Sequence, residues 1–265
     1  MLNLISSTSR RYLSSTSNPS VVVFGGNGWV GSFVVQSLLK KNADVTIISR
    51  SGPKSNEEWH SKVNFQSFDL NNSSKDDLLT LLQENNTTGV VSCVGTFGEP
   101  ALDQDSMFQQ NGLANSFLAE TSKEAGVEHF SYISAHQFPI AKQTVMKGYY
   151  RGKLHAEAAI QSAGFKSSTI LRPGFISGTR NGIPLWIAGT PMSTMFRTDM
   201  MQSVRDKIPN MVGDFLETPI DVADVGVVAA MGALGEIDQV GAGVYGDLDP
   251  LNGREIARLG ELYNR

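Results

Sequence analysis

The chain has 265 residues, of which 40% are hydrophobic and 18% charged, and its formal net charge is −4. These values fit a globular protein with a sizeable core, and they argue against nucleic-acid binding, which needs a basic surface to neutralise phosphates. A single cysteine excludes an internal disulfide and a cysteine metal cluster, and no uninterrupted apolar run approaches the ~20 residues of a transmembrane helix.

Residues 1–18 have the composition of a mitochondrial targeting peptide. Serine and threonine are frequent, Arg10 and Arg11 are basic, and no acidic residue occurs. An ordinary disordered tail is the alternative. We therefore predict that residues 19–265 form a single domain and that the protein is mitochondrial.

A glycine-rich turn between a strand and a helix is the central motif of the chain. The apolar run Val21–Phe24 predicts a buried strand, and the apolar residues after Gly31 recur at helical spacing. Such a turn lets the backbone approach a pyrophosphate, while the N-terminus of the helix offers free N–H groups. A tight turn without a ligand is the alternative, and the side chain of Trp29 either caps the cofactor site or packs beside it. The candidate cofactor-binding residues here are Gly25, Asn27, Gly28, Trp29, Val30 and Gly31.

The end of the second predicted strand, Asp44–Arg50, bears on the choice of cofactor. Folds that bind NAD place an acidic residue about 20 residues after the glycines, to bind the ribose 2′-hydroxyl. Here Arg50 and Ser51 stand in that zone. A guanidinium binds a 2′-phosphate well, so NADP is favoured over NAD. The alternative is that Arg50 is a solvated residue at the end of a strand.

Strands and helices alternate along the rest of the chain. Apolar or alternating runs predict the strands, and a 3.6-residue apolar period predicts the helices. This alternation indicates an α/β fold with a doubly wound parallel sheet of the Rossmann type, and a small lobe where the periodicity weakens, at about 177–218. The predicted strands cover residues 63–68, 89–94, 129–134, 168–172 and 243–245, and the predicted helices 75–84, 107–125, 147–163, 220–234 and 254–263.

The strand predicted at 89–94 carries two residues of interest near its carboxyl end. Gly95 begins the loop after the strand at 89–94, at the carboxyl end of the sheet where ligands collect in open α/β folds. Cys93 lies in the apolar run of that same strand. We expect its thiol to be buried and unreactive, because no basic neighbour is apparent.

Tyr149 and Lys153 are the most informative pair for catalysis. They lie four residues apart on a predicted helix and therefore project from the same face. A lysine ammonium near a phenol favours the phenolate, so we expect it to lower the pKa of Tyr149 toward a range useful for proton transfer. The alternative is a surface helix with a partly buried tyrosine.

Together these motifs resemble those of the short-chain dehydrogenase/reductase (SDR) superfamily, from Ser20 onward. The resemblance implies that Asp69 and Leu70 meet the adenine, that Tyr149 and Lys153 form the catalytic pair, and that Pro173 borders the nicotinamide. The superfamily also places a catalytic Ser or Thr after the fifth strand. The chain reads Ser134-Ala135-His136 there, with His136 at the position of the hydroxyl.

The chain is more closely similar to atypical SDR proteins of mitochondria. The shared stretches are Val23–Gly28, Ser49–Gly52, Tyr132–Ala135, Gly148-Tyr149 with Lys153, and Arg172–Phe175. They look like those of the SDR-like protein associated with the coenzyme Q biosynthetic complex, and more loosely those of the NADPH-binding accessory subunit of respiratory complex I. The resemblance implies an NADP(H)-binding protein of the matrix or of the inner-membrane surface, acting in ubiquinone biosynthesis. Two functions remain candidates: an oxidoreductase, and a non-catalytic nucleotide-binding scaffold in an inner-membrane complex. A sugar-nucleotide epimerase shares the fold but is less favoured, because the small lobe is short.

The predicted small lobe is rich in methionine. Thioether side chains suit a prenyl tail such as that of a quinone precursor, a lipid surface or an adaptable partner interface, and ordinary core packing is the alternative. Five of the nine methionines fall there: Met192, Met195, Met200, Met201 and Met211. The histidines show no metal-ligand spacing, so we expect no metal site.

Overall fold

The computed structural model describes residues 18–52, 57–96, 103–137, 146–180, 183–185, 219–237 and 250–263. The predicted targeting peptide, apart from its last residue, lies outside the described residues, as do the methionine-rich stretch and the strand predicted at 243–245.

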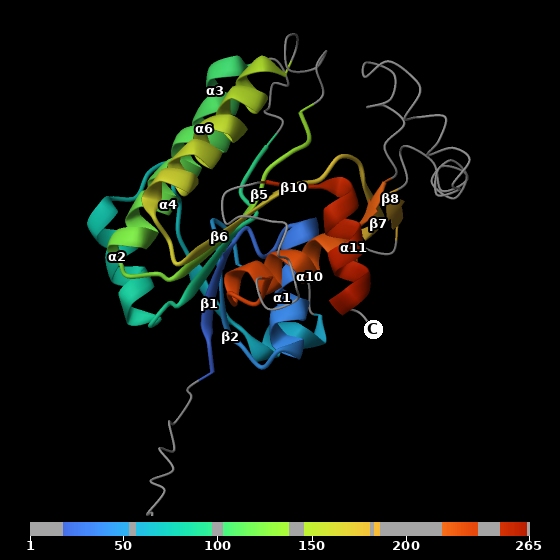
Figure 1. Ribbon diagram of the computed structural model, residues 1–265. Helices are drawn as coiled ribbons and strands as arrows, with labels where there is room; N and C mark the ends of the chain where they lie inside the picture. Colours follow the sequence, from blue (N-terminus) through green and yellow to red (C-terminus); the bar gives the residue numbers. More distant parts are fainter. Residues whose placement is uncertain are drawn as a thin grey trace, which may run out of the picture.

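A seven-stranded parallel sheet forms the centre of the protein (Figure 1). Its strand order is β10-β6-β5-β4-β1-β2-β3. Strands β2 and β3 therefore extend the sheet on one side of β1, and β4, β5, β6 and β10 extend it on the other side. This is the doubly wound Rossmann topology that the sequence predicts. The strands are β1 (Ser20–Phe24), β2 (Asp44–Ser49), β3 (Asn64–Ser67), β4 (Gly89–Ser92), β5 (His129–Ile133), β6 (Ser167–Arg172) and β10 (Leu251–Asn252).

Helices cover both faces of the sheet, and each face has its own core (Figure 1). Along β1, Val21 and Val23 face one core, and Val22 and Phe24 face the other, because successive strand residues point to opposite faces. The first face carries α1 (Trp29–Lys40), α10 (Val222–Ala233) and α11 (Gly253–Tyr263). The second face carries α2 (Lys75–Glu84), α4 (Ala114–Glu124) and α6 (Lys147–Ala163). None of the helices in the described parts of the chain is long and apolar enough to cross a membrane.

Several elements differ from the sequence prediction. The helix predicted at 107–125 begins earlier, with α3 (Gln104–Phe108), and passes through a π-helical turn, η2 (Gln109–Leu113), before α4. A 3₁₀ turn, η1 (Glu58–Lys62), precedes β3. A second sheet has the order β8-β7-β9, and neither it nor β10 was predicted. Its strands are β7 (Ile176–Arg180), β8 (Ile183–Leu185) and β9 (Ile220–Asp221). Strands β8, β9 and β10 have only two or three residues, too few for a periodic signal, and β7 has no continuous apolar run.

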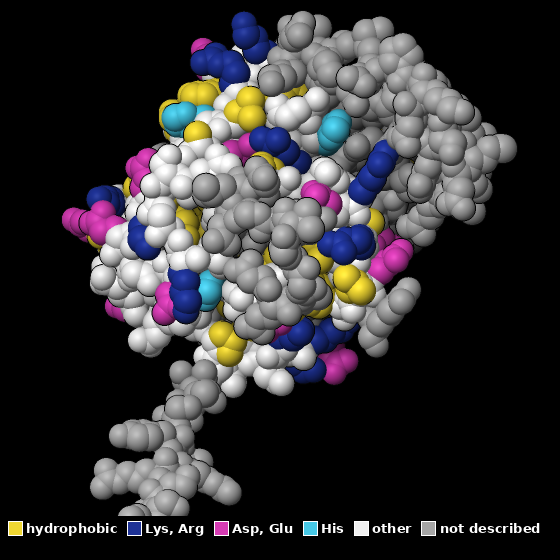
Figure 2. Space-filling model, in the orientation of Figure 1, with side chains coloured by type: hydrophobic (Ala, Val, Ile, Leu, Met, Phe, Trp, Pro, Cys, Tyr) yellow, Lys and Arg dark blue, Asp and Glu magenta, His cyan; other side chains and the backbone are white. Residues whose placement is uncertain are grey.

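Basic and acidic side chains are interspersed over the face seen in Figure 2. This distribution agrees with the small negative net charge of the chain.

Candidate functional site

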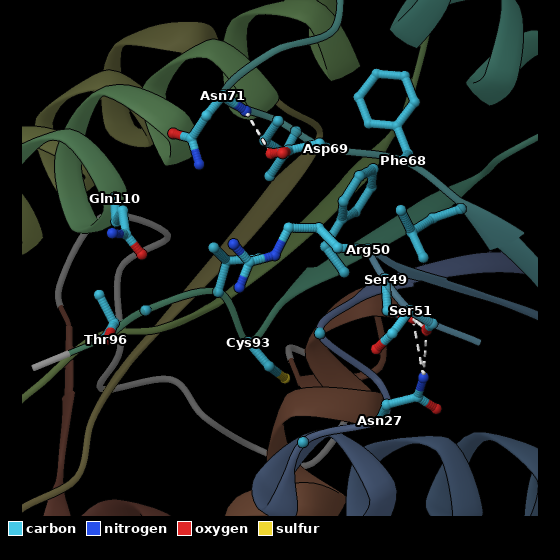
Figure 3. A pocket seen from close by; sticks show the side chains of 17 residues that line it. Asn27, Ser49, Arg50, Ser51, Phe68, Asp69, Asn71, Cys93, Thr96 and Gln110 are labelled. Atoms are coloured by element: carbon cyan, nitrogen blue, oxygen red, sulfur yellow. Dashed lines mark hydrogen bonds between the residues drawn. The ribbon is translucent and has the colours of Figure 1, made fainter. Parts of the chain in front are cut away.

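A cavity of about 360 Å³ opens at the carboxyl ends of β1, β2, β3 and β4 (Figure 3). It lies where the strand order reverses between β1 and β4, which is the place where open α/β sheets bind their ligands. The residues that line it are Phe24, Gly25, Asn27, Gly28, Ile48, Ser49, Arg50, Ser51, Phe68, Asp69, Leu70, Asn71, Cys93, Val94, Gly95, Thr96 and Gln110.

The glycine turn has a conformation that only glycine satisfies at two positions. Gly25 has φ +79°, in the left-handed region, and a Cβ atom on Gly31 would lie 2.2 Å from the carbonyl oxygen of Gly25. Helix α1 therefore packs directly on the turn. Gly28 is its N-cap, no side chain caps the helix, and its first turn contains no acidic residue. The first N–H groups of α1 are consequently suited to an anion such as a diphosphate.

Arg50 extends across the cavity from the end of β2 (Figure 3). It lies between the segment that carries Asp69 and Asn71 and the segment that carries Cys93 and Thr96. Hydrogen bonds from the Asn71 amide and the Asn72 side chain, with a further contribution from the charge of Arg50, hold the pKa of Asp69 below its usual range. The cavity thus places a cation and a carboxylate near each other.

Six residues predicted to bind the cofactor are not among those that line the cavity: Trp29, Val30, Gly31, Tyr149, Lys153 and Pro173. The indole Nε1 of Trp29 donates to the carbonyl of Thr179 at 3.0 Å, so this side chain packs beside the site, against β7. Val30 packs against the core beneath α1. Pro173 is buried, and its carbonyl accepts from the backbone N–H of His136 at 2.9 Å.

Lys153 reaches the edge of the cavity from α6. Its Nζ donates to the carbonyl of Ile133 at 2.8 Å and would lie 3.0 Å from a Cβ atom on Gly95, which lines the cavity. Burial lowers the pKa of Lys153 to about 8. Tyr149 lies on the same face of α6, with its ring centroid 5.7 Å from the ammonium.

The pKa of Tyr149 differs from the sequence prediction. We expected the lysine to lower it, but burial of the phenol raises it, and Tyr150 adds to the increase. Loss of water around the phenol is the main cause of this increase, and the ammonium of Lys153 is directed to the carbonyl of Ile133.

The segment after β5 places Ser134 and His136 differently. The hydroxyl of Ser134 donates to the carboxylate of Glu157, which is also paired with Arg172. Ser134 is therefore engaged inside the protein. His136 is half-buried and its backbone is fixed to Pro173, and its proposed role in polarising a substrate remains a prediction.

Sequence reasoning missed the role of Asn111, a buried residue in the π-helical turn. Its side chain accepts from the N–H of Thr96 at 3.1 Å and donates to the carbonyl of Thr96 at 2.7 Å, and so fixes the loop that lines the cavity. A Cβ atom on Gly112 would lie 2.9 Å from the Cα of Gly152, so the π turn packs tightly against α6. A polar residue on the apolar face of the predicted helix was the available signal.

Comparison with known proteins agrees with this geometry. A family described as NAD(P)H-binding matches residues 25–196, from the glycine turn to beyond β8. The chain belongs to this NAD(P)H-binding family. The matched range includes Arg50 and the pair Tyr149 and Lys153. These residues thus lie in the part of the chain that matches the family.

Three curated proteins are similar to this NAD(P)H-binding chain. An uncharacterized chloroplastic protein of Arabidopsis thaliana is 35% identical over 181 residues, which are 66% of this chain and 58% of that protein. The mitochondrial protein fmp-52 of Neurospora crassa is 34% identical over 63% of this chain and 69% of its own length. MIOREX complex component 2 of Saccharomyces cerevisiae is 28% identical over 60% of this chain and 73% of its own length. The chain spans less than two thirds of the plant relative.

A solved structure supports the fold assignment. A putative NAD-dependent epimerase/dehydratase from Bacillus halodurans superposes with a TM-score of 0.60 at 17% identity, covering 92% of this chain and all of the other. The likeness extends over nearly the whole chain, which establishes the Rossmann-like architecture.

Proposed function

We propose that the cavity binds NADP(H), with the 2′-phosphate at Arg50. The observation that carries this proposal is the position of Arg50, which crosses the cavity from the end of β2. A guanidinium provides two parallel donors to a phosphate. The glycine turn and the start of α1 would hold the diphosphate, and Asp69 and Leu70 would lie beside the adenine.

We further propose that the protein is a mitochondrial oxidoreductase that supports ubiquinone biosynthesis. NADP(H) supplies or accepts a hydride when bound. Tyr149 would transfer the proton, Lys153 would orient the nicotinamide ribose, and His136 would donate to the substrate oxygen. The mitochondrial name of the Neurospora relative supports the location, which we place in the matrix or at the surface of the inner membrane. The resemblance to the coenzyme Q SDR-like protein supports a quinone or a prenylated precursor as substrate.

Two measurements test this proposal. Native mass spectrometry of the purified protein is expected to find bound NADP(H) rather than NAD(H). A spectroscopic assay of NADPH oxidation with quinones is expected to show turnover that falls at least about 100-fold in Tyr149→Phe, because one proton-transfer group contributes about that much. Tyr149→Phe with unchanged turnover would remove the assigned proton donor. NAD(H) alone in the purified protein would contradict the role of Arg50.

A second candidate is a non-catalytic nucleotide-binding subunit of a mitochondrial inner-membrane complex. The lack of a catalytic hydroxyl at His136 favours it, and the nearby hydroxyl of Ser134 is engaged by Glu157 and does not replace it. The yeast relative is named as a component of the MIOREX complex, whereas membership of the coenzyme Q complex or of complex I rests on sequence resemblance alone. Co-purification with such a complex that survives Tyr149→Phe but is lost in Gly28→Val would support this candidate.

A further inference from the structure

Asn27 lies in the glycine turn, but its amide faces the segment that leaves β2 (Figure 3). Its Nδ2 donates to the hydroxyl oxygen of Ser49 at 2.9 Å, and to the carbonyl oxygens of Ser51 and Gly52, each at 3.2 Å. The hydroxyl of Ser49 itself donates to the Ser51 carbonyl, so it accepts from Asn27. Because all three partners are acceptors, the amide nitrogen must point toward them.

The residues that Asn27 holds stand on both sides of Arg50. Ser49 precedes it and ends β2, and Ser51 and Gly52 follow it beyond the sheet. A Cβ atom on Gly52 would meet nothing within 4 Å, so the surroundings of this segment are open. One side chain of the glycine turn therefore fastens the backbone from which the long side chain of Arg50 projects.

We infer that Asn27 is a positioning residue that sets the cofactor specificity of the site through Arg50. By holding residues 49–52, it fixes the base of the Arg50 side chain so that the guanidinium stands in the cavity. A free arginine side chain loses rotamer entropy when it is immobilised, and a fixed backbone limits the further entropic cost of binding. The inference rests on the proposed function, because the 2′-phosphate of NADP(H) is the group that Arg50 would bind.

The contacts also connect two parts of the cofactor site. Gly25 donates its backbone N–H to the carbonyl of Ile48 at 3.0 Å, so the turn and the end of β2 are joined by main chain as well. The turn that would hold the diphosphate thereby fixes the segment that would hold the 2′-phosphate. Loss of Asn27 is expected to weaken the contact of Arg50 with the 2′-phosphate while leaving the contact of the turn with the diphosphate in place.

A double-mutant cycle of Asn27→Ala and Arg50→Ala tests the inference, with dissociation constants for NADPH and NADH measured by calorimetry. Asn27→Ala is expected to weaken NADPH binding about tenfold and NADH binding less than about twofold. In the Arg50→Ala background, removal of Asn27 is expected to change NADPH affinity less than about twofold, because the residue acts through Arg50. The inference would be overturned if Asn27→Ala weakened NADPH and NADH binding equally. It would also be overturned if the losses of NADPH affinity in the two single variants added up in the double variant.

Backbone order parameters from NMR provide the second readout, measured on the full chain without nucleotide. In Asn27→Ala, the order parameters of the backbone amides of residues 50–52 are expected to fall from about 0.85 to below about 0.6. The control Asn64→Ala, which alters an exposed residue of β3, is expected to leave them unchanged. Unchanged order parameters in Asn27→Ala would overturn the inference while leaving the proposed function intact. A wild-type protein without preference for NADPH would overturn both.

Discussion

Glu157 and Arg172 form a bidentate ion pair at the carboxyl edge of the sheet, with 3.0 Å between Arg172 Nε and Glu157 Oε1. Glu157 is only 3% exposed and also accepts from the hydroxyl of Ser134. The pair joins α6 to the ends of β5 and β6. Because Glu157 follows Lys153 by one helical turn, this connection helps to fix the part of α6 that carries Tyr149 and Lys153.

Breaking this pair is expected to destabilise the protein strongly. Glu157→Gln keeps the shape of the side chain but leaves Arg172 without its counter-charge, so we expect a loss of about 3 kcal/mol in the free energy of unfolding. Urea denaturation measures it. The matched control is Glu124→Gln, which breaks an exposed pair with Lys75 and is expected to have no measurable effect. Similar stabilities for the two variants would contradict the structural role of Glu157.

Lys153 makes the stability depend on pH. Burial lowers its pKa to about 8, against an ordinary value of 10.5. Between these values the unfolded chain binds more protons than the folded protein, so the stability contributed at this position rises with pH across that window. From pH 7.5 to 9.5 we expect the free energy of unfolding of the wild type to increase by about 1–2 kcal/mol relative to that of Lys153→Met. Comparison of the two proteins removes the titration of groups distant from Lys153. The pKa of Cys93 depends on Lys153, but at about 12 it keeps the folded thiol protonated across this window. A difference that stays constant with pH would show that Lys153 is not desolvated.

Gly31 is expected to tolerate no side chain. Its Cβ atom would lie 2.2 Å from the Gly25 carbonyl, so Gly31→Ala must displace α1 from the turn. We expect the free energy of unfolding to fall by about 3 kcal/mol. We also expect nucleotide binding to be lost. Gly52→Ala is the control, because nothing lies within 4 Å of its Cβ, and it is expected to change stability by less than about 0.5 kcal/mol. Thermal melts compare the two variants, and a stable, nucleotide-binding Gly31→Ala would contradict the described turn.

Cys93 is expected to be an unreactive thiol even though it lines the cavity. Two parts of the expectation from the sequence were wrong, because the Cys93 side chain is half-buried and the charge of Lys153 lies near it. Desolvation still outweighs that charge and raises the pKa of Cys93 to about 12, so very little thiolate is present near neutral pH. Iodoacetamide at pH 8 is expected to alkylate the native protein far more slowly than the protein in urea, as followed by mass spectrometry. Equal rates in the two conditions would mean that the thiol is exposed and activated.

Local patterns in the sequence were sufficient to predict most of the fold. The glycine turn and α1 follow from adjacent residues, and α2 has the predicted bounds, Lys75–Glu84. The capping of α2 by Ser74 explains its sharp start, because the Ser74 side chain accepts from the N–H of Asp77. Signals of this kind need no information from distant parts of the chain.

Contacts between distant residues account for what the sequence did not reveal. The partner of Trp29 is Thr179, 150 residues away, and the partners of Glu157 are Arg172 at the end of β6 and Ser134 just after β5. The raised pKa of Tyr149 arises from burial, which depends on how α3 and the π turn pack against α6. The short strands of the second sheet likewise depend on pairing rather than on their own residues.

The most direct test of the account is calorimetric titration of the folded wild-type protein with NADPH and NADH. If a dinucleotide binds in the cavity between β1 and β4, with its 2′-phosphate at Arg50, NADPH will bind with a dissociation constant in the micromolar range. NADH will then bind at least about tenfold more weakly, because it lacks the group that Arg50 contacts. An absence of heat with both nucleotides, from protein that unfolds cooperatively, would contradict the central claim.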